Sequence, residues 1–134
     1  MQVRERIQKR FKGYSCDDGE TQRTIRRVYE EHSYLIDTHT AVAFSALEQY
    51  RSETGDDTPC LVVSTASPFK FCDSVLEALG ETQIASGLDA LDQLSQKTGQ
   101  PIPAPLASLR NKRVRFSQVV EKDHMLDAVL GMLG

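Results

Sequence analysis

The segment Leu61–Phe71, which reads LVVSTASPFKF, decides the fold of this 134-residue chain. It opens with the short apolar run Leu61–Val63, which is typical of a strand buried in a sheet. Hydroxyl residues interrupt that run. A helix is expected to follow them, because Ser67 is a good helix cap and Pro68 suits a first helical turn. The pattern therefore predicts hydroxyl groups at the carboxyl end of a strand, where open α/β sheets bind ligands.

The composition indicates one ordinary globular domain. Hydrophobic residues make up 40% of the chain and charged residues 26%, and the length is sufficient to bury a core. No apolar run is long enough to span a bilayer, and no apolar stretch of a signal peptide follows the basic N-terminus. We therefore expect a cytoplasmic protein with no membrane partner.

Neither the cysteines nor the histidines predict a metal site. Cys16, Cys60 and Cys72 are odd in number and lack the spacing of metal ligands, so we expect reduced thiols packed as small hydrophobic groups. The histidines also lack such spacing, and His32 and His124 are expected at the surface. The chain is accordingly predicted to bind no metal.

The charge pattern does not favour a nucleic-acid partner, because the net charge is −3. Basic residues gather in three places, but each group has acidic neighbours or lies on an exposed-looking face, and solvated faces are the preferred interpretation. No role follows from the sequence for the third group. The groups are Arg4, Arg6, Lys9, Arg10 and Lys12; Arg23, Arg26 and Arg27; and Arg110, Lys112, Arg113 and Arg115.

Most of the chain is predicted to be helical. Apolar spacing and capping residues predict helices over about 1–12, 17–32, 38–53, 68–79, 84–99 and 125–133. The prolines at 101–105 predict a loop, and 114–116 predicts a short strand. A single buried strand needs neighbours on both edges. Either 13–16 and 34–36 complete the sheet, or the missing strands belong to another part of a larger protein.

The motifs exclude several kinds of chemistry. The sequence has no G-x-S-x-G elbow to present a nucleophilic serine. Asp37 is also too near His39 in sequence to support that histidine from a separate strand, so a hydrolase is disfavoured. Nucleotide-binding glycine motifs are also absent. The hydroxyls of Ser64 and Thr65 could hold the ring nitrogen of a flat cofactor such as pyridoxal phosphate. Alternatively, they satisfy only turn and cap hydrogen bonds.

Two segments together resemble the C-terminal portion of the threonine synthase family. They are Tyr34–Ala43, which reads YLIDTHTAVA, and Leu61–Phe71; the resemblance extends from about Asp18 to Gly80, and the rest is similar to that family's tail. It implies an α/β fold, namely part of a tryptophan-synthase-like, fold-type II pyridoxal-phosphate domain that is helix-rich with few strands in this chain. It also implies that 1–134 is one C-terminal unit with a helical tail from about 81.

The resemblance implies which residues lie near the cofactor. Thr65, with Ser64 beside it, would face the pyridine nitrogen, while Asp37, His39 and Thr40 would line the same ring edge. Thr38 stands where the family often has proline, and Lys70 is not the lysine that carries the cofactor.

The family's activity is the conversion of O-phospho-L-homoserine and water to L-threonine and phosphate. Its cofactor-carrying lysine, its glycine-rich phosphate loop and most of its substrate ligands lie upstream of the matched part. No catalytic residue is therefore expected in this chain, and the chain alone is predicted to be inactive.

Three hypotheses follow about partners. As the C-terminal portion of threonine synthase, the chain would dock on the missing N-terminal portion of that enzyme, and by itself it could self-associate through exposed apolar surface. As a non-catalytic interaction module derived from the same fold, it would form a defined monomer or dimer without affinity for the cofactor. A small nucleic-acid binder is disfavoured by net charge and by the lack of interleaved aromatic residues.

Overall fold

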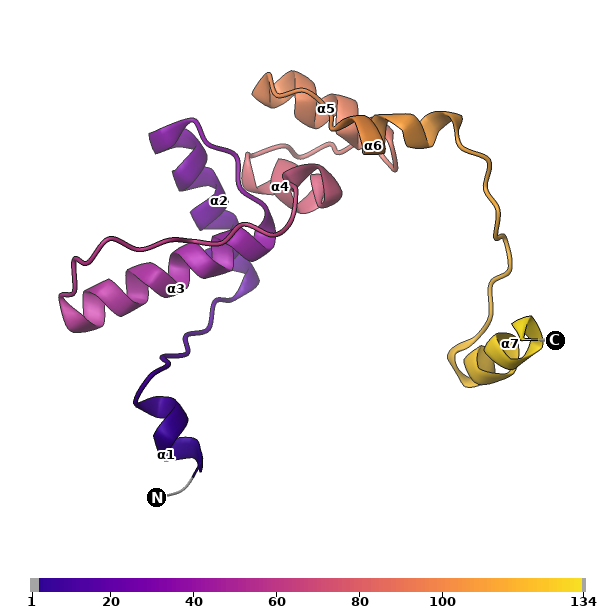
Figure 1. The fold of residues 1–134 in the computed structure, drawn as a ribbon. Helices are drawn as coiled ribbons and strands as arrows, with labels where there is room; N and C mark the ends of the chain where they lie inside the picture. The colour runs from indigo at the N-terminus through magenta and orange to yellow at the C-terminus, as the bar shows by residue number, and fades with distance from the viewer. Residues whose placement is uncertain (1–2, 134) are drawn as a thin grey trace.

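The computed structural model describes residues 3–133 and consists of helices joined by extended segments (Figure 1). Within these residues no strand forms, so the chain is helix-rich as expected but has none of the expected sheet. The α-helices are α1 Val3–Gln8, α2 Asp18–His32, α3 Thr38–Thr54, α4 Cys72–Ala78, α5 Asp89–Thr98, α6 Ala104–Ala107 and α7 Met125–Met132. The 3-10 helices are η1 Pro68–Lys70, η2 Ser108–Asn111 and η3 Lys122–His124.

The capping residues begin and end the main helices where the sequence predicts. The Asp17 side chain accepts a hydrogen bond from the backbone N–H of Glu20 at 2.7 Å and so caps α2. Gly55 ends α3 in the left-handed conformation, with φ of 68°, which glycine adopts without strain. The Ser67 side chain caps η1, and Pro68 occupies its first turn.

Removing the cap of α2 tests this assignment. Asp17→Ala is expected to lower the free energy of unfolding by about 1 kcal/mol, because the N–H of Glu20 loses its acceptor. Asp17→Asn keeps a side-chain oxygen and should cost less than half as much. Urea unfolding followed by circular dichroism measures both, and equal stability of Asp17→Ala and the wild type would contradict the cap.

The core lies where α2 packs against α3 and α4, and α4 packs against α5. Ile25 of α2, Leu76 of α4 and Leu94 of α5 are each fully buried there. Leu35 and Ile36, which precede α3, are buried in the same cluster. The predicted helical stripes therefore face one another and bury the apolar surface that stabilises this part of the chain.

The expected buried strand at Leu61–Val63 is wrong in this structure. Leu61 is 90% exposed and Val63 66% exposed, and their segment runs beside α3 without pairing to another strand (Figure 1). The segments 13–16, 34–36 and 114–116 form no ladder either. The physical reason is that a strand is buried only when neighbouring strands satisfy its backbone. This chain supplies no such neighbours within residues 3–133.

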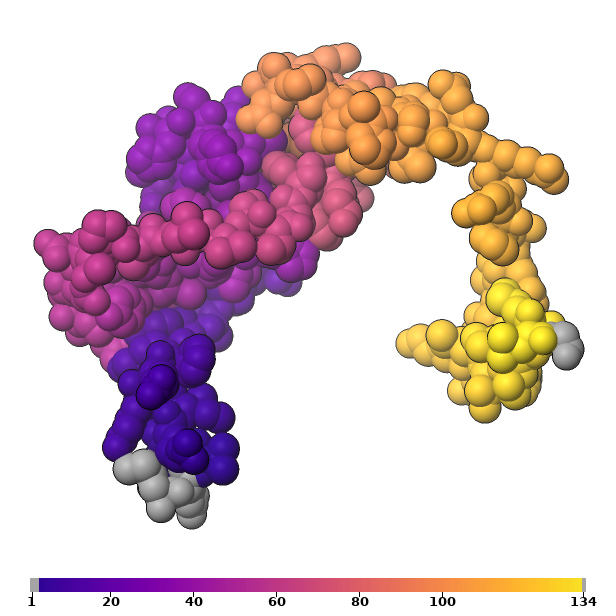
Figure 2. Space-filling model, in the orientation of Figure 1, coloured from indigo at the N-terminus to yellow at the C-terminus, as the bar shows by residue number. Residues whose placement is uncertain are grey.

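Both ends of the described chain extend away from the core (Figures 1 and 2). Helix α7 forms where expected, but it lies apart from the helical body, and its apolar side chains are exposed. The N-terminal helix α1 likewise buries no residue. The large exposed apolar side chains of the two ends include Val3, Ile7, Phe11, Val114, Phe116, Val119, Met125, Leu126, Val129, Leu130, Met132 and Leu133.

The predictions for the cysteines and for the proline-containing loop are each confirmed only in part. Cys72 is buried as predicted, whereas Cys60 is exposed, because its segment is not covered. The predicted loop at 101–105 is shorter than expected, since α6 begins at Ala104 directly after Pro103. None of the helices among the described residues is both long and apolar enough to cross a membrane.

The third basic group is only partly solvated. Arg110 forms ion pairs with Asp89 and Asp92 at 3.1 and 2.5 Å, and it donates to the carbonyl of Leu88, so it ties η2 to the start of α5. The guanidinium of Arg115 lies 5.5 Å from the ring centre of Phe116. Within this basic group, Arg110 therefore has a structural role, because it holds η2 against the start of α5.

Candidate cofactor-binding site

The site is built on Asp37, which caps α3 and is completely buried. Its Oδ1 atom accepts hydrogen bonds from the backbone N–H groups of His39 at 2.9 Å and Thr40 at 3.4 Å. Its Oδ2 atom accepts a short hydrogen bond from the Thr40 hydroxyl. These bonds satisfy both N–H groups at the helix start and fix the carboxylate in one orientation.

The same contacts keep Asp37 ionised. Burial by itself raises the pKa of this carboxyl, but the hydrogen bonds from the Thr40 hydroxyl and from the backbone and ring of His39 outweigh it. The net result is a pKa below the ordinary value. The site therefore contains a buried negative charge at neutral pH, held by hydroxyl, backbone and imidazole groups.

Ser64 joins this group from a distant part of the chain. Its Oγ atom lies 2.9 Å from the Thr40 Oγ1 atom, although 24 residues separate the two in sequence. Four of the five predicted site residues are thus brought together: Asp37, His39, Thr40 and Ser64. The hydrogen bond fastens the extended segment after α3 to the start of that helix.

Thr65 is the fifth predicted residue, and it lies at the exposed end of the extended segment. Side chains of successive residues in an extended chain point to opposite sides. Val62 is half-buried between the exposed Leu61 and Val63, but Ser64 and Thr65 are both exposed, so the alternation ends before Ser64. Ser64 contacts α3 through Thr40, and Thr65 beside it is exposed.

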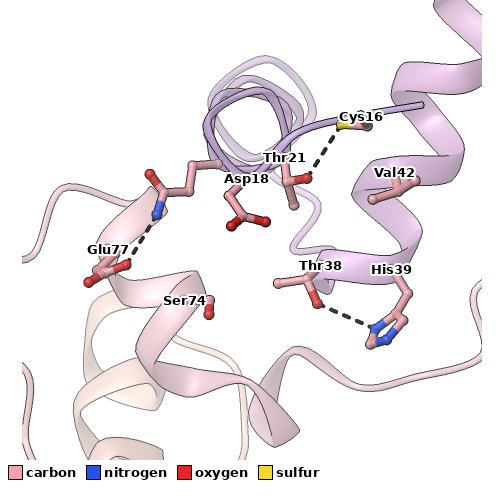
Figure 3. A pocket seen from close by; sticks show the side chains of 9 residues that line it. Cys16, Asp18, Thr21, Thr38, His39, Val42, Ser74 and Glu77 are labelled. Atoms are coloured by element: carbon pink, nitrogen blue, oxygen red, sulfur yellow. Dashed lines mark hydrogen bonds between the residues drawn. The ribbon is translucent and has the colours of Figure 1, made fainter.

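His39 lies on another side of the same group, beside a cavity of about 440 Å³ (Figure 3). Its Nδ1 atom is 3.1 Å from Asp37 Oδ1 and 3.3 Å from Thr38 Oγ1, and its ring packs at 4.9 Å on the ring of Phe71. The imidazole is 63% exposed and can reach a ligand. The cavity is lined by Cys16, Asp18, Thr21, Gln22, Thr38, His39, Val42, Ser74 and Glu77.

Sequence reasoning did not predict this cavity. Its walls come from the start of α2, the start of α3 and the outer face of α4, and no motif links these segments. Among residues 3–133, no group of three or more His, Cys, Asp or Glu side chains could hold a metal ion. The lining of the cavity presents hydroxyl, imidazole and carboxylate groups.

Comparison with known families gives the class of protein to which the chain is similar. The family model described as "Threonine synthase, C-terminal" matches residues 40–129, which include Thr40, Ser64 and Thr65. The match covers more than half of the chain. The chain belongs to the threonine synthase family.

Curated relatives agree with this membership. A threonine synthase of Escherichia coli (strain K12) is 35% identical over 103 residues, which are 73% of this chain and 22% of that protein. A threonine synthase of Methylobacillus glycogenes is 36% identical over 88 residues, 65% of this chain and 18% of that protein. Threonine synthase-like 1 of Mus musculus is 30% identical over 122 residues, 89% of this chain and 16% of that protein. The chain spans less than a quarter of the length of each.

Proposed function

We propose that this chain is the C-terminal portion of a threonine synthase that converts O-phospho-L-homoserine and water to L-threonine and phosphate with pyridoxal phosphate. The family membership and the coverage of the relatives support this proposal. The observation that carries it furthest is the hydrogen bond between Thr40 and Ser64, since it joins the two sequence segments that resemble the family. The whole would have the fold-type II, tryptophan-synthase-like architecture.

The residues of the site fit one edge of the cofactor. A pyridine nitrogen needs a hydroxyl partner that is accessible and is not consumed by the fold, and the exposed Thr65 meets both needs. His39 is exposed enough to line the ring edge, while the buried Asp37 acts behind the site as a cap. When bound, pyridoxal phosphate supplies the electron sink for elimination of phosphate and addition of water.

In this proposal Ser64 and Thr65 orient the cofactor, and Asp37, His39 and Thr40 hold the start of α3 against that edge. No residue of this chain forms or breaks bonds in the reaction. The neutral hydroxyl adds no negative charge at the ring nitrogen, so the ring is less protonated than it would be beside a carboxylate.

The partner implied is the remainder of the enzyme. Leu61 and Val63 expose an apolar side on a segment whose backbone has no strand partner within residues 3–133, which suits addition of that segment to a sheet. Residues 1–134 would then be one C-terminal unit of a cytoplasmic enzyme. Separated from the remainder, the same apolar surface would favour self-association.

The proposal is tested by comparing the 134-residue chain with its full-length protein. The chain alone should release no phosphate from O-phospho-L-homoserine, because it lacks the lysine that carries the cofactor. The full-length protein should form threonine and should show the visible absorption of bound pyridoxal phosphate. A full-length protein without that absorption would contradict the proposal and favour the interaction module.

A further inference from the structure

Two short helices, α1 and α7, stand off the helical body on opposite sides of the view, and each exposes apolar side chains (Figures 1 and 2). No residue within α1 or α7 is buried. The segment between η2 and η3 holds α7 away from the body, and residues 9–17 separate α1 from α2. Both helices therefore present apolar surface to solvent within residues 3–133.

The surface of α1 combines an apolar stripe with basic side chains. Val3, Ile7 and Phe11 are spaced by four residues, and the N–H of Phe11 donates to the carbonyl of Ile7 at 3.0 Å, so the helical turn continues to Phe11. Over residues 3–12 the chain has five basic residues and one acidic residue. The stripe lies in a hollow of about 690 Å³, which is lined by Val3, Arg6, Ile7, Lys9, Arg10 and Phe11.

The surface of α7 is apolar in the same way but opposite in charge. Over residues 121–133 the chain has three acidic residues and one basic residue. Opposite charges around an apolar contact favour encounter of the two surfaces and disfavour wrong partners. The apolar stripe of α7 is between 54% and 77% exposed, and it is formed by Met125, Leu126, Val129, Leu130 and Leu133.

The helical form of α7 also suits the hollow on α1. Side chains of one helix pack between those of another, and both backbones keep their internal hydrogen bonds. The exposed apolar residues Leu61 and Val63 lie instead on an extended segment. Such a segment would leave backbone groups unpaired against a helix, because it needs a strand as partner. A helix with acidic residues is therefore the better match for α1.

The α7 helix that covers α1 must come from a second molecule. Within one chain the two helices lie apart, with open space between them (Figures 1 and 2). Two copies related by a twofold axis can place α7 of each on α1 of the other, which gives two identical interfaces and covers both stripes. We propose that this chain forms a dimer by such an exchange of its terminal helices. The dimer is a property beyond the proposed function and requires neither the cofactor nor the remainder of the enzyme.

Sedimentation equilibrium of the 134-residue chain without cofactor tests the exchange. The wild type should be a dimer that does not grow into larger assemblies. Ile7→Asp and Leu126→Asp should each raise the dissociation constant at least about tenfold, because each dimer loses an apolar contact at both interfaces. Leu61→Asp, at the exposed extended segment, is the control and should not change it. A monomeric wild type, or a dimer that Leu61→Asp disrupts and Ile7→Asp does not, would overturn the proposal.

A mixture of the two variants tests which surfaces meet. Ile7→Asp keeps an intact α7 and Leu126→Asp keeps an intact α1, so one of each can form a dimer with one complete interface. The mixture should therefore associate more tightly than either variant alone and less tightly than the wild type. A mixture that stays monomeric would overturn the exchange. A wild-type affinity of Leu126→Asp alone would indicate pairing of α1 with α1, and of Ile7→Asp alone pairing of α7 with α7, and either result would overturn it as well.

The charge match has its own measurement. Arg6→Glu combined with Arg10→Glu should raise the dissociation constant about two- to tenfold at low salt, since exposed charge pairs contribute weakly. The difference from the wild type should shrink at high salt, because salt screens exposed charges. An unchanged dissociation constant at low salt would overturn the assignment of the acidic helix α7 as the partner of α1.

Discussion

Asp37→Ala is expected to lower the free energy of unfolding by about 2–5 kcal/mol. The variant removes the cap of α3, which is worth about 0.5–2 kcal/mol, and the hydrogen bond that the buried Thr40 hydroxyl donates to the carboxylate, which is worth about 1.5–3 kcal/mol as a bond to a charged group. Urea unfolding of the 134-residue chain at low protein concentration measures the loss. Stability equal to that of the wild type would contradict a structural role for the carboxylate.

The pH dependence of stability provides the matched control. The pKa of Asp37 is lower in the folded chain than in the unfolded chain, so its contribution is complete above the unfolded pKa of about 3.9 and is lost as the pH falls through the folded value. Asp37→Asn keeps a capping oxygen but cannot ionise. Its difference in stability from the wild type should therefore shrink in acid, and a constant difference would exclude this carboxylate as a source of the acid sensitivity.

Leu76→Ala is the second change with a large expected effect, a loss of about 2–5 kcal/mol. Leu76 is fully buried in α4, between the helices that form the core, and truncation leaves a cavity there in addition to the lost burial. Circular dichroism during urea unfolding should show a lower midpoint with an unchanged slope, as expected for a loss of stability alone.

Leu126→Ala removes the same atoms from α7, where the side chain is 67% exposed. In the isolated chain its effect should be within about 0.5 kcal/mol, because little apolar area is buried. A large effect at Leu126 together with a small one at Leu76 would mean that the tail, rather than the body formed by α2, α4 and α5, carries the stability.

Local signals predicted α2, α3 and α7 well, while the helix predicted over 1–12 is only Val3–Gln8. The caps at Asp17 and Asp37 and the glycine at Gly55 act through hydrogen bonds and backbone conformations that span at most four residues. The same holds for Ser67 and Pro68 at the start of η1. Such interactions depend only on residues that are close in sequence, so the sequence is enough to locate them.

The prediction of a buried strand at Leu61–Val63 was wrong because it depends on partners that local sequence does not specify. Its apolar residues predict burial, but burial depends on strands that must pair with it, and residues 3–133 provide none. The segment therefore has the composition of a buried strand, although it does not pair with another strand within residues 3–133. The exposed side chains of α7 follow the same logic, since an amphipathic helix is buried only when another surface covers it.

Sequence alone determined the bounds of α2 and α3 to within a residue or so, their caps, and the family to which the two motifs are similar, whereas the predicted helix over 84–99 begins only at Asp89 and the one over 68–79 is divided into η1 and α4. Only the tertiary structure decided that Asp37 is buried, that Thr40 lies within hydrogen-bond distance of Ser64, and that His39 borders a cavity. The difference is physical. A cap needs atoms a few residues apart, whereas the Thr40–Ser64 contact requires α3 to end and the chain to return along it, which no local pattern specifies.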